Sequence, residues 1–260
     1  MKISIVTVCY NAENTIKDTI RSISAQSHAD VEHLVIDGRS TDDTLSIVQT
    51  YPSKAELRVL SEPDSGIYDA MNKGIALATG DIVGFLNSDD FYASPDVLAT
   101  VARVMANPEV DACFGDLCYV RKTDISRVVR YWRSSPYSSG LFERGWCPPH
   151  PTFFVRREVY RRLGRFDLRY KLAADVELMM RFLEKHKVKA QYIQKILVIM
   201  RLGGVGNRSI SNIKKQNREV LGALRKNGLR ASPILFYGHK LIARGRQFVM
   251  RVPKSKTKST

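Results

Sequence analysis

The chain has 260 residues, 44% hydrophobic and 26% charged, a balance that is typical of a folded globular protein and excludes a disordered or fibrous one. The formal net charge of +15 is unevenly distributed: residues 1–120 carry 8 basic and 18 acidic side chains, residues 121–205 carry 19 and 7, and residues 206–260 carry 14 and 1. Because the first 120 residues are acidic, a uniformly basic nucleic-acid-binding protein is disfavoured, and we expect no nucleic acid partner.

Short β-branched runs alternate with helical patterns over the first 110 residues, which predicts an α/β fold with a mainly parallel sheet flanked by helices. The first four predicted strands span residues 3–9, 31–36, 58–61 and 82–86. Predicted helices lie at residues 14–26, after an N-cap at Ser40, between Pro63 and Gly80, and after Ser94-Pro95-Asp96.

In the second half, strands are predicted at residues 111–120, 127–132 and 152–155, and a helix at 173–186. Residues 134–149 are rich in Ser, Pro and Gly and are expected to form a mobile loop. Residues 198–206 close the globular part. We therefore predict one domain over residues 1–206 and a basic helical tail over residues 207–260, with residues 253–260 disordered.

The cysteine pattern and the N-terminus bear on the cellular compartment. The four cysteines form no CxxC pair and lack histidines at zinc-finger spacing, so neither a disulfide framework nor a zinc site is predicted. The N-terminus is predicted to be a strand and not a signal peptide, and no segment approaches the roughly 18 apolar residues of a spanning helix. We expect a cytoplasmic protein.

Polar side chains follow each of the first four predicted strands, where an open α/β sheet binds its ligand. They are Tyr10 and Asn11, then Asp37, then Glu62 and Asp64, then the run from Asn87 to Asp90. No GxGxxG or GxxxxGK[ST] motif accompanies them, so a dinucleotide fold and a phosphate-cradling loop have no support. A nucleotide bound here would need a metal, and clustered carboxylates suit Mg²⁺ or Mn²⁺.

The segments IVTVCYN, VIDGRSTDDT and EPDSGIYDAMNKGIALATGDIVGFLNSDD resemble successive blocks of the inverting family 2 glycosyltransferases, which have the GT-A fold. PPHPTFFVRREVYRRLGRFD, AADVELMMR and RLGGVG resemble the acceptor half of small bacterial members, so the resemblance covers about residues 1–206. It implies a hexosyltransferase that moves a sugar, with inversion, from a nucleotide-sugar donor (most often UDP-linked) to an acceptor hydroxyl. The closest subgroup builds surface polysaccharides on lipid-linked saccharide acceptors.

By this resemblance, Asn87-x-Asp89 occupies the place of the family's DxD motif. Asp89 is then the metal ligand, and Asp90 assists it directly or through a neighbouring group. Asn87 departs from the usual first carboxylate and is expected to contact the ribose as a neutral amide. The alternative is that NSDD is a polar turn after a strand.

Other residues are assigned to the nucleotide by the same resemblance. Asp37 is expected to accept a hydrogen bond from uracil N3, as an ionised carboxylate can. The alternative is that Asp37 forms an Asx turn, and one carboxylate can do both. Tyr10 is expected to pack on the base, or to be a plain edge aromatic. Asn72 lies on the helix that faces the nucleotide.

Inverting transfer needs a carboxylate on the acceptor side to take the hydroxyl proton. Asp175 matches the family's late acidic motif, and its neighbour Glu177 projects about 200° away around the helix. The alternative is that Asp175 only complements the helix dipole. Asp116, His150 and Arg201 are assigned to the acceptor or the diphosphate, each with a structural role as the alternative.

The tail has an amphipathic pattern from Ser232 to Arg251. Basic side chains flank an apolar stripe, which is typical of an interfacial helix on an anionic membrane surface. The alternative is a helix that packs this stripe onto the domain. A lipid-linked acceptor favours a peripheral site on the inner face of the cytoplasmic membrane. The stripe consists of Ile234, Leu241, Ile242, Phe248 and Val249, with Gly238 and Gly245.

Two other functions are compatible with parts of the sequence. A sugar-phosphate nucleotidylyltransferase shares a similar sheet, but it requires a Gly-rich, Arg-bearing loop after the first strand, which VCYNAENT lacks. A non-enzymatic module that binds membrane or nucleic acid through the basic tail is the second alternative.

Overall fold

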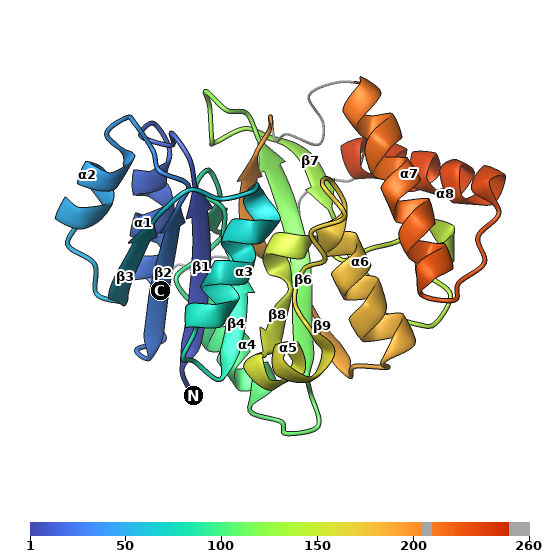
Figure 1. The fold of residues 1–260 in the computed structure, drawn as a ribbon, viewed down its shortest axis with the longest axis horizontal. Coiled ribbons are helices and arrows are strands. Elements are labelled where there is room, and N and C mark those ends of the chain that lie inside the picture. The colour runs from blue at the N-terminus through green and yellow to red at the C-terminus, as the bar shows by residue number, and fades with distance from the viewer. Residues whose placement is uncertain (204–209, 250–260) are drawn as a thin grey trace, which may run out of the picture.

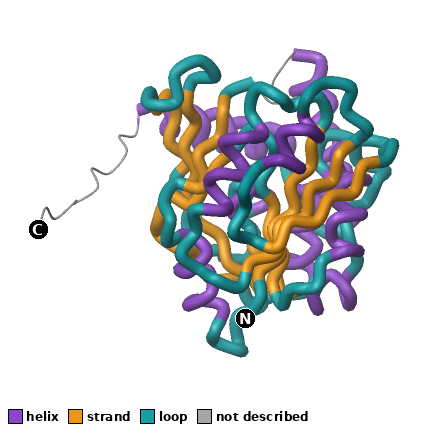
Figure 2. Tube along the Cα trace, turned by 90° about the vertical axis from the view of Figure 1, so that its left-hand side faces the viewer, coloured by secondary structure: helices purple, strands orange, loops and turns teal. Residues whose placement is uncertain are grey.

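The computed structural model describes residues 1–203 and 210–249. Within these residues, nine strands form one twisted mixed sheet in the order β3-β2-β1-β4-β8-β6-β9-β5, with β7 paired to β6 (Figures 1 and 2). The predicted α/β fold with a mainly parallel sheet is confirmed. The strands are β1 (Ile3–Cys9), β2 (Val31–Asp37), β3 (Glu56–Ser61), β4 (Ile82–Phe85), β5 (Phe91–Tyr92), β6 (Ala112–Val120), β7 (Val128–Trp132), β8 (Phe154–Arg156) and β9 (Ala190–Arg201).

Helices cover both faces of this sheet. One hydrophobic cluster joins α3, α5 and α6 to the face turned toward the viewer in Figure 1, and two further clusters join α1, α2 and α4 to the opposite face. The helices are α1 (Ile16–Ser24), α2 (Thr44–Thr50), α3 (Ile67–Leu77), α4 (Val97–Met105), α5 (Arg157–Leu163), α6 (Ala174–Met180), α7 (Ile210–Lys226) and α8 (Pro233–Val249), with short helical turns η1 (Phe142–Arg144), η2 (His150–Thr152) and η3 (Arg181–Lys185).

The parallel register aligns the ends of the first strands. β1 pairs with β2 so that Cys9 lies opposite Asp37, and β2 pairs with β3 so that Asp37 lies opposite Ser61. β4 also pairs parallel with β1. The segments that follow these four strands therefore emerge at one edge of the sheet, as the sequence predicts.

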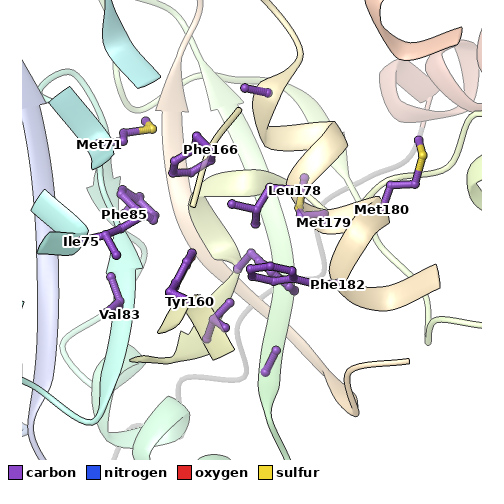
Figure 3. Close-up of a cluster of buried hydrophobic side chains, with 14 of the residues drawn as sticks. Met71, Ile75, Val83, Phe85, Tyr160, Phe166, Leu178, Met179, Met180 and Phe182 are labelled. Atoms are coloured by element: carbon purple, nitrogen blue, oxygen red, sulfur yellow. The ribbon is translucent and has the colours of Figure 1, made fainter. Parts of the chain in front are cut away.

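A hydrophobic core cluster packs α3 and α6 against the sheet. Figure 3 shows Met71 and Ile75 of α3, Phe85 of β4 and Leu178 of α6 in one buried cluster. α3 approaches the sheet closely, because a Cβ atom on Gly74 would lie 2.3 Å from a methyl carbon of Val6. This packing fixes the helix that carries part of the site.

Two predicted helix starts were wrong. Ser40 is not an N-cap, because its hydroxyl donates to Asp37 and α2 begins only at Thr44. Ser94 bonds to Asp96, and the carbonyl of Pro95 accepts from the Ser27 N–H (2.8 Å), so α4 begins after Asp96. In both places a nearby carboxylate, Asp37 or Asp96, takes the hydroxyl that the local pattern assigned to the helix N-terminus.

Residues 134–149 differ from the predicted mobile loop. Glu184 accepts hydrogen bonds from the hydroxyls of Tyr137 and Ser139 and from the N–H of Gly140 (3.1 Å). Phe142 is fully buried within η1. The segment is therefore fastened to the end of the α6–η3 helix. No strand is predicted from the sequence over residues 190–201, where β9 lies, because exposed polar residues in its early part hide the strand pattern.

The tail contains two helices. α7 packs against α6 and buries Val220, Ala223 and Leu224 in the same core cluster as the sheet. α8 lies beside β7 and η1 and buries Phe236 (Figure 1). The predicted domain end at residue 206, the predicted disorder of residues 253–260, and the side chain of Val249 lie outside the described residues.

Candidate functional site

The segments after β1 and β2 are joined by hydrogen bonds at the edge of the sheet. The Asn11 N–H donates to Ser40 Oγ (2.9 Å), and the Thr41 N–H donates to Asn11 Oδ1 (2.9 Å). Asn11 and Arg39 both have positive φ angles, 49° and 68°, which are uncommon for residues with a side chain. Such backbone conformations cluster at functional sites.

Asp37 is completely buried at the end of β2. Its carboxylate accepts from the hydroxyls of Ser40 (2.5 Å) and Ser61 (2.6 Å) and from the N–H groups of Arg39 (3.1 Å) and Ser40 (3.0 Å). Burial alone would raise the pKa of Asp37, but the hydrogen bonds from Ser40 and Ser61 outweigh it and lower the pKa. Asp37 is thus an ionised acceptor, and the predicted Asx turn is present.

Exposed side chains lie close to the buried Asp37. A Cβ atom on Gly38 would lie 2.7 Å from Oδ2 of the exposed Asp64, so a side chain at this position would require the Asp64 carboxylate to move. Tyr10, which follows β1, is 64% exposed. A ring with that exposure is available to a ligand at this edge.

Asn72 lies on α3, the predicted helix. Its side-chain amide donates to the Phe166 carbonyl (3.0 Å) and accepts from the Phe166 N–H (2.9 Å). Both contacts fasten α3 to the segment before α6. The structure gives Asn72 this positioning role, and its contact with the nucleotide stays a prediction.

The segment after β4 turns so that Asp90 points inward. Asn87 Nδ2 donates to Asp90 Oδ2 (3.2 Å), while Asn87 Oδ1 and Asp90 Oδ1 are buried and have no hydrogen-bond partner among the described residues. Burial, and then the charge of Asp89, raises the pKa of Asp90 well above its usual range. Asp90 therefore retains its proton more strongly than an exposed aspartate does, whereas Asp89 is half-buried.

Arg201, at the end of β9, holds this segment in place. Its guanidinium donates to the Asp89 carbonyl (2.8 Å) and to Asp18 Oδ2 on α1 (2.5 Å), and it lies over the Phe91 ring at 5.2 Å. The charge of Arg201 is thus paired within the protein. Arg201 is a positioning residue for the Asp89 turn, which differs from the predicted diphosphate contact.

The side chains of Asp89 and Asp90, beside that of Asn87, are the candidate ligands for a divalent cation. The described residues contain no group of three His, Cys, Asp or Glu side chains suited to a metal. Mg²⁺ and Mn²⁺ sites that bind nucleotides commonly use one or two carboxylates, with phosphate oxygens and water completing the shell. The half-buried Asp89, with the unpartnered Asn87 and Asp90 oxygens beside it, fits that mode of binding.

Asp175 lies in the first turn of α6 and is half-buried. Its Oδ1 accepts a hydrogen bond from the Tyr68 hydroxyl of α3 (2.9 Å). Burial, and then the charge of Asp175 and this hydrogen bond, raises the pKa of Tyr68. The phenol therefore stays protonated and orients the carboxylate. Sequence reasoning missed Tyr68, although it stands inside the block that resembles the family, between Ile67 and Asp69.

His150 connects the two halves of the site. Its ring lies 5.3 Å from the Phe85 ring at the end of β4 and 5.5 Å from the Phe166 ring, between centroids. Burial lowers the pKa of His150, and the charge of Asp175 opposes this shift only in part. His150 is therefore a neutral imidazole in an aromatic wall between the Asn87–Asp90 turn and Asp175.

Asp116 has a structural position within β6. Its carboxylate accepts from the hydroxyls of Tyr131 (2.5 Å) and Tyr192 (2.7 Å) and from the Ser134 N–H (2.8 Å). It is 1% exposed. These three hydrogen bonds tie β6 to β7 and β9, which supports the structural alternative for this residue.

The sequence matches a family model described as "Glycosyl transferase family 2" over residues 4–164. It is also 31% identical over 208 residues to a "PGL/p-HBAD biosynthesis glycosyltransferase" of Mycobacterium bovis (strain BCG / Pasteur 1173P2), an alignment that covers 78% of each chain.

Two solved structures are similar in fold. The S. aureus TarS 1–349 structure in complex with UDP-GlcNAc has a TM-score of 0.67 and 19% identity, and the similarity covers 96% of this chain and 73% of TarS. The mannosyltransferase PcManGT from Pyrobaculum calidifontis, in complex with GDP-Man and Mn²⁺, has a TM-score of 0.64 and 23% identity, with 93% and 68% covered. At these identities the similarity concerns the fold.

Proposed function

Since the chain belongs to glycosyl transferase family 2 and has the GT-A fold of a glycosyltransferase, we propose that it is a metal-dependent inverting enzyme that uses a UDP-sugar. The acceptor in this proposal is a hydroxyl of a lipid-linked saccharide in bacterial surface polysaccharide assembly. Asp175 carries the proposal, because it is a half-buried carboxylate oriented by Tyr68. The Phe166 ring lies beside the rings of Tyr68 and His150. The His150 ring in turn lies beside that of Phe85, at the end of the strand that leads into the turn containing Asp89.

On the donor side, Asp89 would hold Mg²⁺ or Mn²⁺ together with the diphosphate. The ion supplies positive charge to the diphosphate as it departs. Arg201 keeps the Asp89 turn in place, and the unpartnered Asn87 Oδ1 accepts a hydrogen bond from a ribose hydroxyl. Tyr10 stacks on the base and Asp37 accepts from the N3–H of uracil, a role supported by the ionised state of its carboxylate.

On the acceptor side, Asp175 removes the proton of the attacking hydroxyl. Tyr68 occupies Oδ1, which leaves Oδ2 for the substrate. As the acceptor oxygen bonds to the anomeric carbon, the bond from that carbon to the phosphate oxygen breaks and the nucleoside diphosphate leaves. Attack from the side opposite the leaving group gives inversion. The buried aromatic wall of Phe85, His150 and Phe166 excludes water from this step.

Binding of the donor nucleotide tests the donor side. UDP with Mn²⁺ at about 100 times its Kd is expected to raise the Tm by about 5 °C or more, measured by thermal unfolding. GDP, ADP and dTDP serve as comparisons for the base. If none of the four nucleotides stabilises the protein, the proposal of a nucleotide-sugar donor is contradicted. Pyrophosphate exchange into a nucleotide sugar would instead favour the nucleotidylyltransferase.

The membrane part of the proposal depends on α8. Three residues of the predicted apolar stripe are exposed: Ile234 (84%), Leu241 (72%) and Ile242 (58%), whereas Phe236 on the other face is 1% exposed. Residues 206–260 carry 14 basic side chains and one acidic side chain. We propose that an anionic lipid surface covers this stripe. No helix in the described part of the chain is long and apolar enough to cross a bilayer.

Replacing both Ile234 and Leu241 with serine is expected to weaken binding to phosphatidylglycerol vesicles by about tenfold or more, since burial of each side chain stabilises by about 1.5–3 kcal/mol. Vesicle sedimentation measures this. Val59→Ser is the control, because Val59 is an exposed apolar residue on β3, at the edge of the sheet far from α8 (Figure 1). Unchanged sedimentation of the double variant would contradict the membrane proposal.

A further inference from the structure

Three cations meet where α8 packs on β7. Lys240 and Arg244 lie one turn apart on the domain-facing side of α8, and Arg130 lies on β7. Arg130 Nε donates to Gln247 Oε1 of α8 (2.6 Å). Its guanidinium lies over the Tyr119 ring at 4.4 Å and the Trp132 ring at 5.5 Å. We call Arg130, Lys240 and Arg244 the cation cluster.

Arg130 and Lys240 differ from Arg181 and Arg201 in their ion pairing. Arg181 pairs with Glu177 at 3.2 Å, and Arg201 pairs with Asp18. Arg130 is only 8% exposed, yet neither it nor Lys240 forms an ion pair with a carboxylate in residues 1–203 and 210–249.

The contacts of Lys240 are neutral. Its ammonium donates to Asn217 Oδ1 (2.6 Å) and lies 5.4 Å from the Phe236 ring centroid. Burial, and then Arg244, lowers the pKa of Lys240. Buried cations without counter-charge are costly, so a ligand anion at this place would stabilise the protein.

The cluster adjoins the acceptor side of the site. Lys240 donates to Asn217 of α7, a helix that packs against α6. Two residues further along α7, Glu219 accepts from the N–H groups of Leu172 (2.8 Å) and Ala173 (3.1 Å). These two residues lie just before the first turn of α6, which carries Asp175. An anion bound by the cluster therefore lies near the carboxylate that accepts the proton of the attacking hydroxyl.

We propose that the cation cluster binds the diphosphate of the lipid-linked acceptor, an inference that rests on the proposed function. The donor diphosphate is assigned to the Asp89 turn, so the cluster is a second phosphate site. The attacking hydroxyl then belongs to a sugar close to the diphosphate. α8 presents its apolar stripe on one face and the cluster on the other, so one helix contacts the lipid surface and the headgroup of the acceptor.

Direct binding tests this site without sugar transfer. In a Trp146→Phe background, Trp132 is the one remaining tryptophan, and it lies beside Arg130. Farnesyl diphosphate is titrated in the presence of saturating UDP and Mg²⁺, with farnesol as the neutral comparison. Trp132 fluorescence is expected to shift with farnesyl diphosphate and not with farnesol.

Variants identify the residues. Lys240→Gln and Arg130→Gln are each expected to weaken farnesyl diphosphate binding by about tenfold or more, with UDP binding unchanged. The control is Arg225→Gln, an exposed cation on α7. If Arg130→Gln unfolds, Lys240→Gln still decides the outcome.

Any of the following results would overturn the proposal: no fluorescence shift in the Trp146→Phe protein, equal binding of farnesol, unchanged affinity in Lys240→Gln, or an equal loss of UDP affinity in that variant. If Lys240→Gln or Arg130→Gln loses binding to phosphatidylglycerol vesicles but retains farnesyl diphosphate binding, the cluster is assigned to membrane headgroups. That result would also overturn the proposal. Absence of UDP binding together with tight farnesyl diphosphate binding would contradict the proposed donor alone.

Discussion

Asp175→Asn is expected to lower kcat by about 10²- to 10⁴-fold, because it removes the base that takes the proton of the acceptor hydroxyl. Asparagine has nearly the same shape and still accepts the hydrogen bond from Tyr68, so the fold and the donor site should be unchanged. Transfer of label from a UDP-sugar at saturating substrates measures kcat, and the Tm increase with UDP and Mn²⁺ measures donor binding.

The matched control is Glu158→Gln, which neutralises an exposed carboxylate on α5, a helix outside the site. It should retain the parent kcat. Near-parent transfer by Asp175→Asn would remove the assignment of the base and leave the helix-dipole alternative. A loss of UDP binding in the same variant would mean that Asp175 supports the donor site instead.

Asp89→Asn is expected to lower kcat/KM by about 10²- to 10³-fold and to raise the Mn²⁺ concentration needed for half-maximal activity. The variant keeps the side-chain size, while the carbonyl that binds Arg201 belongs to the backbone and is retained. The stabilisation of the protein by UDP should then no longer depend on Mn²⁺, which thermal unfolding measures separately from activity.

Asp30→Asn is the control for this charge change, because Asp30 is exposed just before β2, at the opposite edge of the sheet. Its metal dependence should match that of the parent protein. An unaltered Mn²⁺ requirement in Asp89→Asn would contradict the assignment of the metal ligand.

The sequence predicted the strands well where both faces are buried. β1 and β2 are buried throughout, so continuous apolar runs identify them. β9 was not predicted as a strand, because half of the residues from Ala190 to Lys195 are exposed and polar. Helix starts failed at Ser40 and Ser94, where each hydroxyl donates to a nearby carboxylate, that of Asp37 and of Asp96, instead of capping a helix.

The candidate site was predicted in outline and not in its contacts. The parallel topology indicates which strand ends meet, so the neighbourhood of Asp37 and the Asn87–Asp90 turn follows from the pattern. The bond from Asn72 to Phe166 and the bonds from Arg201 join residues far apart in the sequence. Such pairs depend on how helices pack on the sheet, which periodicity along one segment does not contain.

In the tail, too, the contacts between distant segments could not be predicted from the sequence. The sequence identified the amphipathic stripe of α8 but left open which face meets the domain. Packing resolves this, because Phe236 and Gln247 contact the domain while Leu241 faces outward. The buried Arg130 on β7 could not be associated with Lys240 from the sequence alone, since 110 residues separate them.

Inverting, metal-dependent sugar transfer is tested most directly with a panel of radiolabelled nucleotide sugars and lipid-linked acceptors. The anomeric configuration of the product's linkage is determined by NMR. Inverting transfer predicts that a UDP-sugar with an α-linked leaving group gives a β-linked product and that UDP is released in equal amount. Metal dependence predicts that removal of the divalent metal abolishes the reaction. A product with the same anomeric configuration as the donor, or no transfer from any donor while the protein remains folded, would contradict the proposed inverting transfer.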